Sequence, residues 1–437
     1  MGAVVMVNVA AIFSTLGNPN SLVPLLVKDS ASTAGMTAGS LITGKEEGHD
    51  RFIDEVGTEI IWLCAIPGYK WGFDKTIFKA FNLDSNFDVR NLKNKEIFEK
   101  IKQYAPDDII RKNLKNIEKK QYLFKKLALY KFFFSTGMAI ASYIGLTRMK
   151  QAYTENKIRK NLIEEYNKRQ LKENTKSEKN QAPSFKGIGN IVKNFAFSPV
   201  KNMWILDGAI TTERLADSRT PQEFTGYAIK EASILCFMYY AGGKIQKYLE
   251  DRANKKYNKN IALDARVIEN GNLKKSFDNK TIEDSLQEFK KLLENKKLNK
   301  AGSDADIYEF IHQNPDNQIV KFAKESDIIK MYNKTEKIDT RKYLDIEEFK
   351  NMFKNIDNLY TQYQEALEKG ESSELFFNKV KKLKRSSIIK NIGTCIFALG
   401  VVTPAIMLVK SFLSKDDTEF QTKKEIRNKL IEEGLIA

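Results

Sequence analysis

The chain of 437 residues is poor in the side chains that most often carry out chemistry. It has two histidines, His49 and His312, so the usual acid–base residue and the commonest metal ligand are almost absent. Its three cysteines, Cys64, Cys236 and Cys395, lie in apolar stretches without a Cys-x-x-Cys spacing. This pattern favours buried, reduced thiols over a disulfide framework. We therefore expect no metal ion and no cofactor.

Catalytic and nucleotide-binding motifs are also scarce. Residues 39–45 have the GxxxxGK spacing of a phosphate-binding loop, but Glu46 stands where that motif needs serine or threonine, and no hydrophobic strand precedes it. The acidic runs 303–310 and 337–349 lack the central glycine and the ligand spacing of a calcium loop. The sequence predicts no catalytic residue, and we expect a protein that is not an enzyme.

Signals for β-strands are few. The chain has nine prolines, hardly any alternating Val/Ile/Thr runs, and long segments with leucine, isoleucine and phenylalanine at helical spacing, such as 281–298. A helix start is well marked at 220–223, where a threonine N-cap, a proline and a capping-box glutamate follow one another. These patterns predict an all-α fold, with one helix from this start to about Leu249.

Four helical segments are strongly apolar: 52–75, 127–150, 221–249 and 387–412. Segment 387–412 contains 19 uncharged residues and segment 127–150 contains 16, which is enough for each to cross a bilayer. The uncharged parts of the other two are 10 and 12 residues long and suit re-entrant, interfacial or buried helices better. With the apolar N-terminal segment 1–47, these helices predict an integral membrane or membrane-associated protein.

An internal duplication is indicated by matches between the two halves. Residues 81–93 resemble 261–274, and residues 158–165 resemble 426–433. At an offset of 172, five residues match five others, namely Phe52, Glu59, Leu63, Cys64 and Lys75 with Phe224, Glu231, Leu235, Cys236 and Lys247. The shared order predicts two parallel repeat units. Their ranges are 48–167 and 200–437, with a flexible linker at 168–199 and a polar helical insert at about 250–385 in the second unit.

Two kinds of candidate site follow. Glu59 and Glu231 occupy equivalent places beside the apolar parts of their helices, where a carboxylate near hydrocarbon is often functional. The alternative, which we favour, is a position at the lipid headgroups or in a first helical turn. Gly137, Ala141 and Gly145 form a small-residue stripe that lets another helix approach closely.

A short charged segment precedes the helix that starts near residue 220. It contains Glu213, Arg214, Asp217 and Arg219. Charge pairs before a helix are usually solvated and contribute little to stability. We therefore expect these side chains to lie in water and not in a site.

The net charge favours an anionic partner. Lysine and arginine total 72 against 56 acidic residues, which gives +16. Only 13 of the basic residues are arginines, and the lysines are spread through every polar segment. Nucleic acid is therefore an unlikely partner, whereas membrane lipids of an anionic leaflet explain both the charge and the apolar helices. A homo-oligomer or a protein partner is also compatible with the sequence.

These features predict a bacterial-type, multi-pass membrane protein with most of its polar mass in the cytoplasm and a non-enzymatic structural, scaffolding or interaction role. Every polar segment is rich in lysine, so the positive-inside rule does not fix the topology. Two alternatives stay open. One is a soluble basic helical protein that binds nucleic acid or a protein partner. The other is an oligomeric transporter or channel with Glu59 and Glu231 in its pathway.

Overall fold

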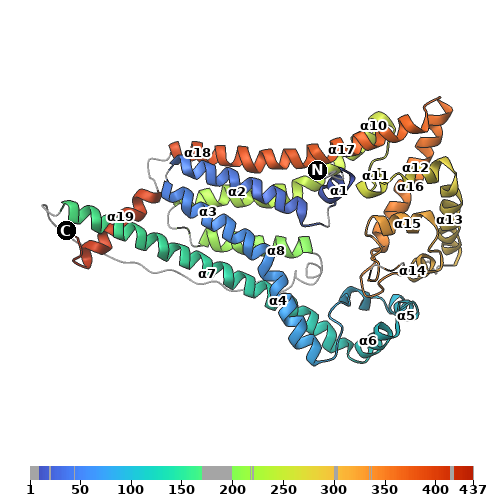
Figure 1. The fold of residues 1–437 in the computed structure, drawn as a ribbon, viewed down its shortest axis with the longest axis horizontal. Helices are drawn as coiled ribbons and strands as arrows, with labels where there is room; N and C mark the ends of the chain where they lie inside the picture. Colours follow the sequence, from blue (N-terminus) through green and yellow to red (C-terminus); the bar gives the residue numbers. More distant parts are fainter. Residues whose placement is uncertain are drawn as a thin grey trace, which may run out of the picture. The chain divides into compact units, whose positions relative to one another are not determined.

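The computed structural model describes residues 9–18, 21–43, 45–169, 199–216, 218, 221–299, 304–333, 335, 337–413 and 418–436. All regular elements in these ranges are helices, and the only strand-like pairing is an isolated bridge between Met331 and Ile338 (Figure 1). The all-α prediction is confirmed. Most of the predicted linker 168–199 lies outside the described residues.

The chain forms two compact units, each built from separate stretches of sequence. Unit 1 comprises residues 1–24, 72–130 and 242–393, and unit 2 comprises residues 25–71, 131–241 and 394–437. Each compact unit therefore draws on both of the predicted repeat units. The predicted boundaries 48–167 and 200–437 stay a prediction about sequence relationship.

Unit 1 contains most of the short, polar helices. They are α1 (Val9–Leu16), η3 (Val89–Leu92), α5 (Lys95–Gln103), α6 (Asp108–Lys119), α10 (Gly242–Tyr257), α11 (Ala265–Glu269), α12 (Asn272–Asp278), α13 (Thr281–Asn299), α14 (Asp304–Gln313), α15 (Gln318–Glu325), α16 (Ile346–Glu368) and most of α17 (Ser373–Phe397). The unit has a large apolar core rich in phenylalanine. In it the ring of Phe289 lies 4.8–5.4 Å from the rings of Phe310, Phe349 and Phe353. Unit 1 thus has the apolar interior of a water-soluble domain.

Three Asp-x-Arg turns shape the loops of unit 1, at 88–90, 264–266 and 339–341. In each turn the aspartate accepts a hydrogen bond from the backbone N–H of the arginine two residues later, and the guanidinium pairs with the same carboxylate. The first two turns fall in the segments that resemble each other in sequence, 81–93 and 261–274. The local match therefore extends to the backbone.

Unit 2 is built from longer helices. They are α2 (Val23–Thr43), α3 (Lys45–Ile60), α8 (Pro199–Ala216), α9 (Pro221–Ile234), α18 (Thr403–Leu413), α19 (Thr418–Glu432), the start of α4 (Ile66–Phe73) and most of α7 (Gln121–Arg169). Three π-helical turns interrupt the long helices, namely η1 (Ile61–Ala65) between α3 and α4, η5 (Leu235–Ala241) between α9 and α10, and η6 (Ala398–Val402) between α17 and α18. The predicted helix start near residue 220 is observed, since α9 begins at Pro221.

The polarity of unit 2 is inverted relative to unit 1. Large apolar side chains are exposed along α7 and along the helix that runs from α17 to α18, including Phe133, Phe134, Met138, Phe397, Val401, Ile406 and Val409. Charged and hydroxyl side chains are buried between the helices, including Lys28, Thr33, Asp54, Glu55, Arg214, Lys230 and Glu231. An apolar exterior around a polar interior is the arrangement that a lipid environment favours.

The closest helix approach in unit 2 is between α2 and η6. A Cβ atom on Gly35 would lie 2.2 Å from the backbone oxygen of Gly400, so the two backbones touch at a point where only glycine fits. The predicted stripe behaves differently, because nothing lies within 4 Å of a Cβ placed on Gly137 or Gly145, and Ala141 is exposed. As a contact between helices of this chain, the stripe prediction is wrong. As a surface for a second copy it stays a prediction.

Candidate functional site

A network of buried charged side chains joins four helices of unit 2. Its centre is Arg214 of α8, which is 5% exposed. Its guanidinium donates from Nη1 to Oε1 of Glu231 at 2.5 Å, from Nη2 to Oδ2 of Asp54 at 3.0 Å, and from Nε to the hydroxyl of Tyr143 at 2.7 Å. One arginine therefore links α8 to α9, α3 and α7.

A second buried cation continues the network. Lys230 of α9 is fully buried, pairs with Glu55 of α3, and has its Nζ 3.4 Å from Oε1 of Glu231. On the other side, Nζ of Lys150 in α7 lies 3.4 Å from Oδ1 of Asp54. Positive and negative groups thus alternate through the interior of the unit.

The local sequence explains how each helix delivers its groups. Asp54 and Thr58 are four residues apart on α3, so they share one helical face. Both contact the Arg214 guanidinium, Thr58 through its hydroxyl at 3.3 Å. An ionised group removed from water is costly unless it is paired and hydrogen-bonded, and in this network each carboxylate faces a cation from another helix. The network therefore stabilises one arrangement of α3, α7, α8 and α9 against alternatives.

Two sequence predictions are corrected at this point. We expected Glu231 at the headgroups or in a first helical turn, but its side chain is buried against two cations. We expected Arg214 in water, but it is the centre of the network. Asp217 and Arg219 of the same charged segment lie outside the described residues.

The second candidate carboxylate, Glu59, has a different environment. It is half-buried and accepts a hydrogen bond from the hydroxyl of Thr33 on α2 at 3.2 Å. Glu231 accepts an equivalent bond from Thr211 on α8, also at 3.2 Å. In both halves of the unit, therefore, the glutamate is bonded to a threonine of the preceding long helix.

An aspartate completes the similarity. Asp29 precedes Thr33 by four residues on α2, and Asp207 precedes Thr211 by four residues on α8. The spacing places each aspartate on the same helical face as its threonine. Sequence comparison missed this match because its offset is 178 and not 172. Each half of unit 2 therefore carries an Asp-x-x-x-Thr helix followed by a glutamate helix, which supports the predicted duplication.

The two aspartates lie in the same polar interior. Asp207 accepts a hydrogen bond from the hydroxyl of Tyr239 in η5. The electrostatic neighbours of Asp29 include the carboxylates of Asp207, Glu55 and Glu59, and the ammonium of Lys230. Neighbouring like charges disfavour full ionisation, so this part of the interior is suited to holding a proton or a cation.

The cysteines only partly follow expectation. All three are free, as expected, but Cys64 in η1 and Cys236 in η5 are exposed, and only Cys395 is buried. The π-helical turns carry the first two at matching places, shortly after Glu59 and Glu231. Among the described residues no group of histidine, cysteine, aspartate and glutamate is arranged to hold a metal ion.

His312 in unit 1 is buried and packs between aromatic rings. Its ring stacks on Tyr104 at 4.6 Å and lies 4.8 Å from the ring of Tyr308. Burial, reinforced by the charge of Lys324, lowers the pKa of His312 to about 4. The imidazole is therefore neutral at pH 7 and belongs to the packing of α14.

Two helices in the described part of the chain are long and apolar enough to cross a membrane by length and composition, Gln121–Glu164 and Ser373–Lys410. Only 33% of each apolar window is buried, whereas a core helix of a soluble protein is mostly buried. The predicted segments 52–75 and 221–249 are not among them. The comparisons with known proteins are negative, since no family model, curated protein or solved structure matches the chain.

Proposed function

We propose that unit 2 is embedded in a lipid bilayer and anchors unit 1 there as a lysine-rich helical domain, in a structural or interaction role without catalysis. The observation that carries this proposal is the inverted polarity of unit 2, in which buried charges are surrounded by exposed phenylalanine, valine and isoleucine. In water this exterior would be a large apolar patch of the kind that monomeric proteins avoid. Against acyl chains it costs nothing, and the interior charges satisfy one another.

The two spans in this proposal are α7 and the helix that continues from α17 through η6 to α18. The uncharged runs 132–147 and 391–409 lie within them. The net charge of +16 gives the polar parts an attraction to an anionic leaflet. The competing explanation is a soluble protein whose apolar exterior is covered by a protein partner.

A charge placed on the exposed apolar face distinguishes the two explanations. Val401 of η6 is 52% exposed, so an arginine there points away from the helix packing of unit 2. In a bilayer Val401→Arg costs about 2.5–3.5 kcal/mol of insertion free energy and should reduce the membrane-bound fraction, with Val401→Leu as the control. In water the arginine is tolerated. Leu399 is unsuitable because it is fully buried, and arginine there would disrupt packing in either environment.

The measurement is carbonate extraction of a membrane fraction from cells that express the full chain. The proposal expects wild type and Val401→Leu in the pellet, with Val401→Arg lost from it. Release of the wild-type protein by carbonate, or equal retention of both variants, would overturn the bilayer proposal.

A second candidate function is proton- or cation-linked transport by unit 2. It is favoured by the duplicated set of Asp29, Thr33 and Glu59 against Asp207, Thr211 and Glu231 inside the polar interior. Asp29→Asn and Asp207→Asn remove one charge from each half. In reconstituted vesicles, a pH- or ion-driven flux that both variants abolish would establish transport. Equal ion permeability of wild type and empty vesicles would leave the anchoring role.

A further inference from the structure

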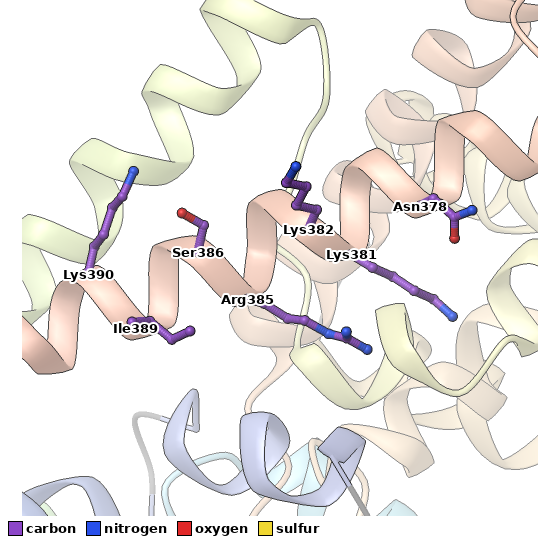
Figure 2. Close-up of a pocket in the computed structure, with 7 residues that line it drawn as sticks. All are labelled: Asn378, Lys381, Lys382, Arg385, Ser386, Ile389 and Lys390. Atoms are coloured by element: carbon purple, nitrogen blue, oxygen red, sulfur yellow. The ribbon is translucent and has the colours of Figure 1, made fainter.

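A groove on α17 in unit 1 is lined by positive charge. It encloses about 680 Å³. Figure 2 shows its side chains in two rows along the helix, Lys381 and Arg385 on one side and Lys382, Ser386 and Lys390 on the other. The members of each row are four residues apart, so each row follows one face of the helix. No acidic side chain lines the groove.

One carboxylate orients the first row. Glu269 of α11 accepts two hydrogen bonds from the guanidinium of Arg385, at 2.7 and 2.8 Å, and its backbone oxygen accepts one from Nζ of Lys381 at 3.2 Å. Lys382 and Lys390 in the second row are exposed. Four cations therefore border the groove against a single neighbouring acid, which leaves a strong field for an anion.

The groove ends where the longest uncharged run of the chain begins. Lys390 directly precedes the run 391–409, and both belong to one continuous helix. The exposed apolar side chains of that helix start in the groove with Ile389 and continue with Phe397 and Val401 at spacings of eight and four residues. Cations at the end of a membrane span lie at the level of the headgroups, with apolar side chains beside the acyl chains.

We propose that this groove binds the headgroup of an anionic phospholipid, with its phosphodiester between the two rows and its acyl chains along the apolar face from Ile389 onward. The proposal rests on the function proposed above, because it needs the helix after Lys390 to lie in a bilayer. Lys382 and Lys390 donate to the phosphate oxygens, while Arg385 and Lys381, held by Glu269, form a fixed positive wall.

The test compares two double variants of equal charge in the full chain. Lys382→Gln/Lys390→Gln removes the exposed cations of the groove. Lys291→Gln/Lys354→Gln removes two exposed lysines of α13 and α16, outside the groove, as the control. The protein is reconstituted in phosphatidylcholine vesicles, and enrichment of phosphatidylglycerol around it is measured as lipid composition is varied.

A lysine near an anionic surface contributes about a factor of five in binding. The groove variant should therefore lose about 30-fold in phosphatidylglycerol affinity, and the control variant should lose little. Equal losses in both variants, no preference of wild type for phosphatidylglycerol, or equal displacement by inorganic phosphate alone would overturn the proposal. Failure of the wild-type protein to insert into phosphatidylcholine vesicles refutes the bilayer proposal itself, whereas insertion without lipid preference refutes only the groove.

Discussion

Removing the Arg214 guanidinium is the sharpest test of the buried network. Arg214→Met keeps much of the side-chain volume but leaves the carboxylates of Asp54 and Glu231, each 3% exposed, without their shared cation. Breaking a buried ion pair by deleting one partner costs about 3–5 kcal/mol, because a charge remains buried without compensation. Lys150 and Lys230, each 3.4 Å from one of these carboxylates, offset part of that cost. We therefore expect a loss near the lower limit, about 3 kcal/mol.

The charge argument makes a second, opposite prediction. In Asp54→Asn/Arg214→Met/Glu231→Gln, neither carboxylate is left ionised and unpaired. The triple variant should therefore be more stable than the single variant, although it removes more groups. A simple count of lost contacts predicts the reverse order.

The measurement is thermal unfolding of the purified protein in detergent, followed by tryptophan fluorescence. For a unit of this size, 1 kcal/mol shifts the midpoint by about 2–4 °C, so Arg214→Met should lower it by about 6–12 °C. Arg252→Met, at an exposed arginine of α10, is the matched control and should leave the midpoint almost unchanged. A single variant as stable as this control, or a triple variant less stable than the single one, would refute the reasoning.

Three further outcomes are expected. Gly35→Val should separate α2 from η6 and lower the free energy of unfolding by about 2 kcal/mol or more, whereas Gly137→Ala, in open space, should leave unfolding midpoints nearly unchanged. The folded pKa of His312, about 4, lies below its unfolded value of about 6.5. The folded state therefore binds fewer protons, and unit 1 should lose roughly 1.4 kcal/mol per pH unit as pH falls from about 6.5 to 4. His312→Phe should remove that slope in urea titrations of the full chain across this pH range. Glu231→Gln should destabilise unit 2 by more than Glu59→Gln, because only Glu231 neutralises buried cations, and equal midpoints in detergent would contradict this.

Much of the fold class followed from local sequence. The spacing of leucine, isoleucine and phenylalanine, the N-cap residues and the scarcity of strand signals act within a few turns of chain, and the helices form where these patterns occur. The two long uncharged runs likewise became parts of α7 and the α17–α18 helix, because length and composition are properties of the sequence itself.

The faces of those helices were decided only by tertiary structure. In an uncharged run every position is equally apolar, so periodicity does not tell the inner face from the outer one. Leu399 is fully buried and Val401, two residues away, is half exposed, because the first faces neighbouring helices and the second does not. The glycine stripe failed for a related reason. Backbones approach closely only where both helices are small at the crossing, as at Gly35 and Gly400.

The charged site shows the same division. The sequence singled out Glu59 and Glu231 because they occupy equivalent positions beside apolar stretches, and it placed Arg214 among solvated charges because its neighbours are polar. Whether a charge is in water depends on groups that are distant in sequence. Arg214 is buried by Asp54, 160 residues away, as well as by Glu231, 17 residues away. Local sequence determined which residues carried charge and which segments were helical. The packing of α3, α7, α8 and α9 decided which charges met, because an ion pair forms only where the fold brings its two members together.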